Sequence, residues 1–555
     1  MQANGILIEA VATLCTAGAV PAYAADFSYE WYTAANNGDL IPGTDRLFNS
    51  YNQPTINDGG RVAFRARSRG GQGQPEHGIY ARDLDEFGPI VTVFRRLGTV
   101  PQPNNATYGP GRELAHFNEF PSVPRIDAGS DTLATRGMSQ PVWQDAMDDT
   151  RTGSAGVYAN PQGVPTTAAS MLGDVPGFEY FQVPIPEVPA GTGFDQFPGS
   201  PAVTERNTIV FKGNFAVGGV GKTGVFYRNV VANGGVAPIG LIASSYTPIP
   251  GGTSTFGSTA PPSAAGKYVV FVGYDNEAKP TAGGIYRAQL GNKPIRLETI
   301  VKIGDPVPGE AKGDQFRFKA FGEAVSLSSN GRHVLFWGTW GSETYDVEVT
   351  CPNEGNAAVR AYCIERSDDG LGTSTRAVPV HQGFFVRDMQ LRKTAVIAKT
   401  GGDFKDFVYW NFSGRAPGMG GGEEGSDDIE EPARWRTATF GAVSSNGVPS
   451  VSAFKARSSD GASSEPVDGI YLRKVLPSKA SAVMPLLQTG MPGVMVDPQT
   501  PAGTVITSLG IERDGFRGQW LAVSLGMAAA GGSEEDSGWA GIYAARFFDE
   551  DLIAP

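Results

Sequence analysis

The chain has 555 residues, a formal net charge of −12, 74 glycines and 40 prolines. Glycine and proline together form about a fifth of the chain, against a usual total of roughly 12%, which indicates many short strands joined by turns. The excess of acidic groups repels nucleic acids and anionic membranes, so we expect no nucleic-acid partner.

The N-terminus has the features of an export signal. Residues 6–20 are mostly apolar, and Ala22-Tyr23-Ala24 is a small-x-small cleavage site, although the first basic residue is Arg46. We therefore expect a signal peptide over 1–24 and a secreted or periplasmic protein over 25–555. No segment predicts a transmembrane span, and we expect a monomer.

The cysteines fit this compartment. Cys15 lies inside the predicted signal, which leaves Cys351 and Cys363 in the mature chain. An even pair in an exported protein predicts a disulfide. The alternative is two reduced thiols in a cytosolic protein.

A short string of Gly, a β-branched or aromatic residue, and Tyr or Phe recurs along the chain. The seven copies are Gly78-Ile79-Tyr80, Gly156-Val157-Tyr158, Gly224-Val225-Phe226, Gly284-Ile285-Tyr286, Gly383-Phe384-Phe385, Gly469-Ile470-Tyr471 and Gly541-Ile542-Tyr543. An apolar strand such as Val62-Ala63-Phe64 precedes each copy, and an apolar stretch with a Gly-Asp turn follows most of them. Before each apolar strand comes an extended stretch that we expect to open at Phe48, Phe117, Phe194, Phe256, Phe321, Phe440 and Leu509.

Each unit therefore predicts four strands, and seven such units predict an all-β fold, a single seven-bladed β-propeller of four-stranded blades. A solenoid is the alternative, but the unit length varies too much for regular stacking. The last unit has little room for a fourth strand. Residues 28–40 carry the missing strand and its Gly38-Asp39 turn, so we expect the N-terminal strand to complete the last blade. An independent N-terminal hairpin is the alternative.

The strand entry Asn57-Asp58-Gly59-Gly60-Arg61-Val62-Ala63-Phe64 resembles the NxxGxxAF tandem-repeat family. The family consists of exported bacterial proteins of unknown function, often with a C-terminal sorting anchor. The resemblance implies a repeat and a compartment, and it implies no catalytic residues. The chain end at Phe547-Phe548 and beyond shows no such anchor.

The longest variable segments predict the functional face. Loops between strands two and three, and loops between units, emerge on one face of a propeller. The inserts 338–382 and 412–439 both belong to that set. Because binding residues concentrate on variable loops of a rigid scaffold, we place the site on this face near the axis.

Candidate ligand-binding residues follow from this placement. Arg65 and Arg67 alternate on one strand near His77, an arrangement suited to an acidic sugar or a carboxylate; exposed strand-end charge is the alternative. His116, Glu119 and Glu323 fall at early positions of innermost strands, where a carboxylate pair could work as acid and base or hold a cation; an inert water-filled channel is the alternative. Trp340 could stack on a sugar or pack between blades, and His381 is a further candidate.

Three other patterns favour a structural interpretation. Residues 216–223 are close to a phosphate-binding loop, but a repeat strand follows instead of a helix, which predicts a flexible hairpin. The acidic run 423–431 could hold Ca²⁺ but matches no Ca²⁺-loop spacing, so we predict no cofactor and no metal site. The aspartates of the Gly-Asp turns, Asp39, Asp174, Asp305 and Asp403, are expected to cap those turns.

The sequence favours a module that binds a ligand or partner through its loop-rich face, such as an extracellular glycan or a protein. The first alternative is a polysaccharide lyase or glycoside hydrolase on the same face, an analogy at the level of the fold. The second is a cell-surface structural or adhesive protein. Whether the chain is an enzyme stays open.

Overall fold

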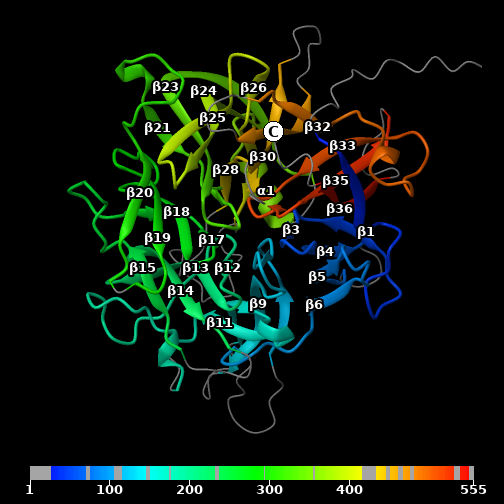
Figure 1. The fold of residues 1–555 in the computed structure, drawn as a ribbon. Coiled ribbons are helices and arrows are strands. Elements are labelled where there is room, and N and C mark those ends of the chain that lie inside the picture. The colour runs from blue at the N-terminus through cyan, green and yellow to red at the C-terminus, as the bar shows by residue number, and fades with distance from the viewer. Residues whose placement is uncertain are drawn as a thin grey trace, which may run out of the picture.

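The computed structural model describes residues 27–69, 75–104, 115–144, 151–173, 177–231, 237–292, 294–353, 357–414, 433–444, 450–459, 467–475, 481–530 and 538–548. Seven antiparallel sheets stand in a ring, which confirms the seven-bladed β-propeller (Figure 1). No helix in these ranges is long and apolar enough to cross a membrane.

The blades are numbered 1–7 in chain order, and within each blade the strands run from the axis outwards. Blade 1 contains β2 (Phe48–Tyr51), β3 (Thr55–Ile56), β4 (Arg61–Ser68), β5 (His77–Asp83) and β6 (Val91–Arg95). Blade 2 contains β7 (His116–Glu119), β8 (Arg125–Ile126), β9 (Leu133–Gln144), β10 (Arg151–Ala159) and β11 (Thr166–Ser170). Blade 3 contains β12 (Ala202–Thr204), β13 (Thr208–Val217), β14 (Val220–Asn229) and β15 (Gly240–Ser244). Blade 4 contains β16 (Ser258–Thr259), β17 (Ser263–Ala265), β18 (Tyr268–Tyr274), β19 (Gly283–Gln289) and β20 (Leu297–Lys302).

The last three blades carry the inserts and the ring closure. Blade 5 contains β21 (Phe318–Phe321), β22 (Ser326–Leu327), β23 (His333–Thr350), β24 (Thr373–Asp388) and β25 (Lys393–Lys399). Blade 6 contains β26 (Phe404–Asp406), β29 (Gly441–Ser444), β30 (Ser450–Ser458), β31 (Asp468–Val475) and β32 (Met484–Gln488). Blade 7 contains β33 (Thr504–Gly510), β34 (Phe516–Arg517), β35 (Trp520–Ala529), β36 (Trp539–Phe547) and β1 (Tyr29–Asn36).

The remaining elements lie outside the blade sheets. They are the two-stranded ribbon β27 (Tyr409–Ser413) and β28 (Arg434–Ala438), helix α1 (Ala357–Glu365), and the short helical turns η1 (Pro161–Gly163), η2 (Glu179–Phe181), η3 (Asp314–Phe316) and η4 (Gly493–Met495). The ribbon interrupts the innermost strand of blade 6, because β26 and β29 both pair with β30.

The repeated aromatic residues explain why the sequence repeats. In each of blades 1–6 an aromatic residue in or before the innermost strand meets the aromatic residue of the Gly-x-Tyr string edge to face, with ring centroids 4.8–5.2 Å apart. Such pairs are favourable beyond their buried area. Three expected positions are corrected. In blade 5 the ring that makes this contact belongs to Phe318 instead of Phe321, and in blade 6 it belongs to Phe404 instead of Phe440. An inserted segment precedes Phe440, which hides the true start of the strand. In blade 7 the innermost strand opens at Thr504, and Leu509 lies near its end.

The glycine of the string is required by close packing. A Cβ on Gly78 would lie 2.4 Å from the carbonyl oxygen of Phe94, and a Cβ on Gly541 would lie 2.5 Å from the hydroxyl of Tyr543. At the same place in every blade the pairing with the outermost strand shifts by one residue, so that strand has a β-bulge. Seven apolar clusters, one at each junction between neighbouring blades, form the core of the described chain.

The N-terminal strand closes the ring as expected. β1 pairs antiparallel with β36, from Tyr29 opposite Phe547 to Asn36 opposite Gly541. The buried carboxylate of Asp497 fastens this closure, since it accepts hydrogen bonds from the Asn36 side chain (2.9 Å), from Trp539 Nε1 (3.0 Å) and from the Tyr543 hydroxyl (2.9 Å).

At three junctions between blades an arginine side chain donates hydrogen bonds to backbone carbonyls at the bulge of the preceding blade. Arg82 of blade 1 donates to the carbonyl oxygens of Thr33 and Ala34 in the closing strand, at 3.3 Å each. Arg228 of blade 3 and Arg473 of blade 6 reach the bulge carbonyls of the preceding blade in the same way. Each guanidinium group therefore satisfies carbonyls that the bulge has removed from the ladder.

Residues 511–518, here called the axial segment, fill the centre of the ring. The short inner strands β3, β8, β12, β17, β22, β29 and β34 contact one another in a closed circle. From blade 7 the axial segment reaches every other blade. Its hydrogen-bond partners include Ile56, Arg125, Ser200, Ser263, Ser326 and Ser444.

A buried ionic network holds the axial segment. Asp514 pairs with Arg517 at 2.6 Å and with Arg125 at 3.4 Å, while Arg125 also pairs with Glu512. Burial alone would raise the pKa of Asp514, but Arg517, Arg125 and Arg513 outweigh it and hold this pKa below its usual value. Burial lowers the pKa of Arg513 to about 10. Each of these arginines therefore depends on carboxylate and carbonyl partners.

Removal of the charge of Asp514 tests this network. The Asp514→Asn variant removes the carboxylate that pairs directly with the buried Arg125 and Arg517, so we expect the free energy of unfolding to fall by about 3–5 kcal/mol. Urea unfolding followed by tryptophan fluorescence measures this change. A loss below about 1 kcal/mol would show that the network is not needed for stability.

Removal of the Asp497 carboxylate tests the closure. The Asp497→Ala variant removes the acceptor of the Trp539 and Tyr543 donors and one of the two acceptors of the Asn36 side chain, and we expect a loss of about 2–4 kcal/mol. The matched control is Asp305→Ala, because Asp305 accepts a single backbone hydrogen bond in the turn between blades 4 and 5. We expect that variant to lose about 1 kcal/mol or less. Equal losses would contradict the special role of Asp497.

Candidate functional site

Arginine residues gather around His77 at the junction of blades 1 and 2, on the loop-rich side. Arg67 stands opposite His77 across the β4–β5 pair, two residues after Arg65. Arg96 follows β6, and Glu119 ends β7 of the next blade. We call Arg65, Arg67, Arg96, His77 and Glu119 the arginine cluster.

Arg65 is the most buried guanidinium group of the arginine cluster. One of its terminal nitrogens donates to Asn52 at 3.0 Å, while its Nε is buried with no hydrogen-bond partner. Burial lowers the pKa of Arg65, and the nearby Glu119 carboxylate partly opposes that effect. Arg67 is exposed and donates to the Ser50 hydroxyl at 2.8 Å.

His77 is neutral at physiological pH. Burial lowers its pKa to about 4, and the positive charges of Arg65, Arg96 and Arg67 act in the same direction. Its ring lies edge-on to Phe120, with centroids 6.1 Å apart. Its Nδ1 atom is buried with no hydrogen-bond partner, so one ring position keeps unused hydrogen-bonding capacity.

The other predicted channel residues have separate surroundings. His116 opens β7 and has a buried Nδ1 without a partner, like that of His77. The exposed Glu119 carboxylate raises the pKa of Arg65. The exposed Glu323 carboxylate instead raises the pKa of Tyr274 and that of Arg513 in the axial segment. The structure therefore brings Glu119, and not Glu323, into the arginine cluster.

Trp340 and His381 belong to blade 5, away from the arginine cluster. Trp340 is only 3% exposed, packs against Phe385 and stacks on His381 with ring centroids 6.0 Å apart. Its ring therefore offers no exposed face for a sugar, and the packing alternative holds. His381 is half-exposed and lies 3.5 Å from the Glu343 carboxylate.

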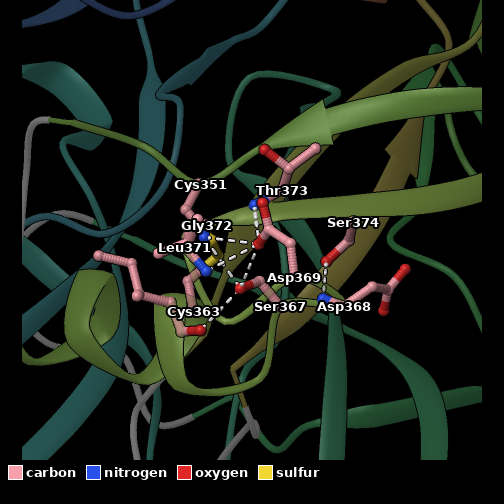
Figure 2. The surroundings of a disulfide bond; sticks show 10 residues. Cys351, Cys363, Ser367, Asp368, Asp369, Leu371, Gly372, Thr373 and Ser374 are labelled. Atoms are coloured by element: carbon pink, nitrogen blue, oxygen red, sulfur yellow. Dashed lines mark hydrogen bonds between the residues drawn. A yellow bond between two sulfur atoms is a disulfide. The ribbon is translucent and has the colours of Figure 1, made fainter.

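The insert 338–382 is an extension of blade 5. β23 and β24 continue as a long hairpin whose tip carries α1, which projects near the centre of the ring in Figure 1. The predicted disulfide between Cys351 and Cys363 joins the end of β23 to α1 (Figure 2). α1 packs against Phe412, Ala433 and Trp435 of the ribbon segment, so the two inserts form one apolar unit.

The acidic turn after α1 in Figure 2 is structural. One carboxylate oxygen of Asp369 accepts the backbone N–H groups of Leu371, Gly372 and Thr373 at 2.8–2.9 Å. These hydrogen bonds lower the pKa of Asp369 to about 2. Within the described ranges no group of three or more His, Cys, Asp or Glu side chains could hold a metal ion.

The remaining patterns behave as structural features within the described part of the chain. Residues 216–223 belong to the tight β13–β14 hairpin and open no helix. Asp39 and Asp305 accept backbone N–H groups in their turns at 2.9 Å, as expected for capping residues. The signal peptide, Asp174 and the acidic run 423–431 lie outside the described residues.

A Ser-His-Asp arrangement that the sequence did not predict joins blades 5 and 6. The Ser450 hydroxyl lies 2.7 Å from Nδ1 of His333, and Nε2 of His333 lies 3.4 Å from the Asp388 carboxylate. Ser450 is 2% exposed and His333 is 4% exposed. A nucleophile needs contact with its substrate, so this buried arrangement serves as a tie between blades.

No family model and no curated protein matches the chain. Among solved structures, it is similar to prolyl oligopeptidase B from Galerina marginata (8% identity, 88% of this chain, 56% of that chain, TM-score 0.32). It is also similar to an endo-1,5-α-L-arabinanase from Thermotoga petrophila (9% identity, 90% of this chain, 99% of that chain, TM-score 0.23). A third similar structure is a periplasmic gluconolactonase from Pseudomonas aeruginosa (11% identity, 79% of this chain, 98% of that chain, TM-score 0.22). The chain spans about half the length of the oligopeptidase. These likenesses assign neither a ligand nor a reaction.

The pKa of His77 can be tested through the pH dependence of stability. Between pH 6.5 and about 4 the unfolded chain binds a proton at His77 that the native state does not bind, so the wild type loses stability as the pH falls through this window. We expect the His77→Gln variant to lose less. Melting temperatures at pH 7.5 and 4.5 provide the comparison, and parallel losses in the two proteins would contradict a neutral buried His77.

Proposed function

We propose that this protein is an exported binding propeller whose arginine cluster holds an anionic ligand, specifically the carboxylate or sulfate groups of an acidic extracellular glycan. The predicted signal peptide and the disulfide support export. The loop-rich face supplies the surface.

One observation carries the proposal: positive charge is concentrated in a protein whose net charge is −12. The three guanidinium groups of Arg65, Arg67 and Arg96 lower the pKa of His77, and the Glu119 carboxylate raises that of Arg65. Because a local positive field on an otherwise negative surface attracts anions to that place, an anionic ligand is the complementary class.

The unused hydrogen-bonding groups support the same ligand class. Nε of Arg65 and Nδ1 of His77 are both buried and without partners. Leaving buried polar groups unsatisfied costs free energy, and a carboxylate or sulfate oxygen satisfies guanidinium donors with charge-assisted hydrogen bonds.

A lyase acting on the same ligand is the second candidate, and the state of His77 favours it. A neutral imidazole can take the proton beside a uronate carboxylate, while an arginine neutralises the charge that develops there. Binding is required for either activity, so binding is tested first.

Replacement of the exposed and the buried arginine tests the proposal. We expect the Arg65→Gln and Arg67→Gln variants each to weaken binding of polygalacturonate, alginate or chondroitin sulfate by about tenfold or more, since each loses a charge-assisted hydrogen bond. Isothermal titration calorimetry at two salt concentrations measures this, and affinity should fall as salt rises. Arg392→Gln, which replaces an exposed arginine in the turn between β24 and β25, is the control.

The outcomes separate the alternatives. Equal affinity in the arginine variants and the control would overturn the arginine cluster as the site. Absorbance from new double bonds that depends on His77 would convert the binding proposal into a lyase. No binding to any member of the panel would reject an acidic glycan.

A further inference from the structure

A hollow of about 550 Å³ lies at the outer rim, where blade 7 meets blade 1. Its lining comes from three segments: four consecutive residues of β1, the turn after β5, and the segment around η4. We call this hollow the rim groove. It is separate from the arginine cluster, which lies at the junction of blades 1 and 2 and shares no residue with this lining.

The rim groove follows a free strand edge. Side chains of a strand alternate between its two faces, so Glu30, Trp31, Tyr32 and Thr33 can line one hollow together only where it runs along the edge. The other edge of β1 pairs with β36, and β1 is the outermost strand of its sheet. The backbone of β1 therefore presents unpaired hydrogen-bonding groups to the groove.

Apolar side chains flank this edge on both sides. On the side of blade 1 stand Tyr32, Leu84 and Phe87. On the other side stand Trp31, Met495 and Val496. An extended peptide added to β1 would alternate its side chains between these two walls, which is the geometry of recognition by strand addition.

Phe87 is held in an unfavourable conformation to form one wall. Its φ is 51°, in the left-handed region that a bulky residue rarely adopts, and its side chain is 74% exposed. Its ring lies 5.8 Å from that of Tyr32. Glycine would relieve this φ, so the exposed ring at the wall of the rim groove points to a contact outside the chain.

The acidic side chains around the rim groove favour a partner with basic side chains. Glu30 lines the groove and is exposed, and Glu86 is exposed on the turn beside Phe87. Arg82 donates through Nε to the carbonyl of Gly88 and through one terminal nitrogen to the carbonyls of Thr33 and Ala34. We propose that the rim groove docks an extended peptide segment of a partner protein as an additional strand on β1, with apolar side chains against the two walls and basic side chains beside Glu30 and Glu86. Arg82 marks the end of the free edge at Thr33.

Selection of peptides from a phage-displayed library of linear decapeptides, panned against the full chain, tests this proposal. We expect enriched sequences that combine apolar residues at consecutive positions with basic residues. N-methylation of every second residue of a synthetic enriched peptide should abolish binding in one register and spare it in the other, because only one register faces β1. Insensitivity to the register would overturn strand addition.

The Phe87→Gly variant separates binding from folding. Glycine relieves the strained φ, so the melting temperature should stay the same or rise, while peptide affinity falls at least tenfold. Leu97→Gly is the matched control, since Leu97 is 59% exposed with φ 62° but lies outside the groove lining. Peptide affinity that survives in Phe87→Gly, or falls equally in Leu97→Gly, would overturn the proposal.

Other occupants give distinct results. If sedimentation shows a dimer that Phe87→Gly dissociates, the occupant is a second copy of the chain and the proposal fails. If neutral oligosaccharides bind and peptides do not, the groove is a sugar site and the proposal fails. Peptide binding should persist in the Arg65→Gln and Arg67→Gln variants, so this proposal and the acidic-glycan proposal can fail independently.

Discussion

The interaction between Asp514 and its arginines is the constraint on which the centre of the ring depends. Taking charges out of water costs several kcal/mol per ion unless each finds close partners. Here Asp514 and Arg517 pair within blade 7, whereas Arg125 comes from blade 2 and finds its carboxylates only when the blades stand in a closed circle. The axial segment thus fills the axis with polar groups and makes the correct assembly of blades the condition for their pairing.

Much of this fold can be predicted because its packing rule is local and repeated. Gly78 and Tyr80 lie two residues apart on one strand, and the same spacing recurs in each blade, so the aromatic contact leaves a visible pattern. The closing strand can be recognised from its Gly38-Asp39 turn. The true opening residue of blade 6, Phe404, cannot, because a ribbon interrupts the innermost strand. The axial network leaves no sequence pattern, since the partners Arg125 and Asp514 are 389 residues apart.

Some residues of the candidate site can likewise be predicted from the sequence, and others cannot. Alternation along β4 and pairing with β5 are enough to predict that Arg65, Arg67 and His77 lie together. Arg96 carries no such signal, because it reaches His77 only through the turn after β6, where Leu97 takes a left-handed conformation. Trp340 is a candidate by residue type, since tryptophan suits sugars, but residue type alone does not report burial. Residues fixed by strand pairing can be predicted, and those fixed by turns or by burial cannot.

The β-bulge that recurs in each outermost strand also determines which part of the β1 edge stays open at the rim groove. A bulge frees carbonyls that need a donor, and at the closure Arg82 supplies it to Thr33 and Ala34. The same arginine that fastens β1 to blade 1 therefore protects one part of the strand edge and leaves the part before it open. Natural edges are usually guarded by charge or by covering loops. At β1 the charge of Glu30 is accompanied by the exposed ring of Phe87 on the neighbouring turn, and this apolar side chain beside the edge is what distinguishes a docking edge from an unused one.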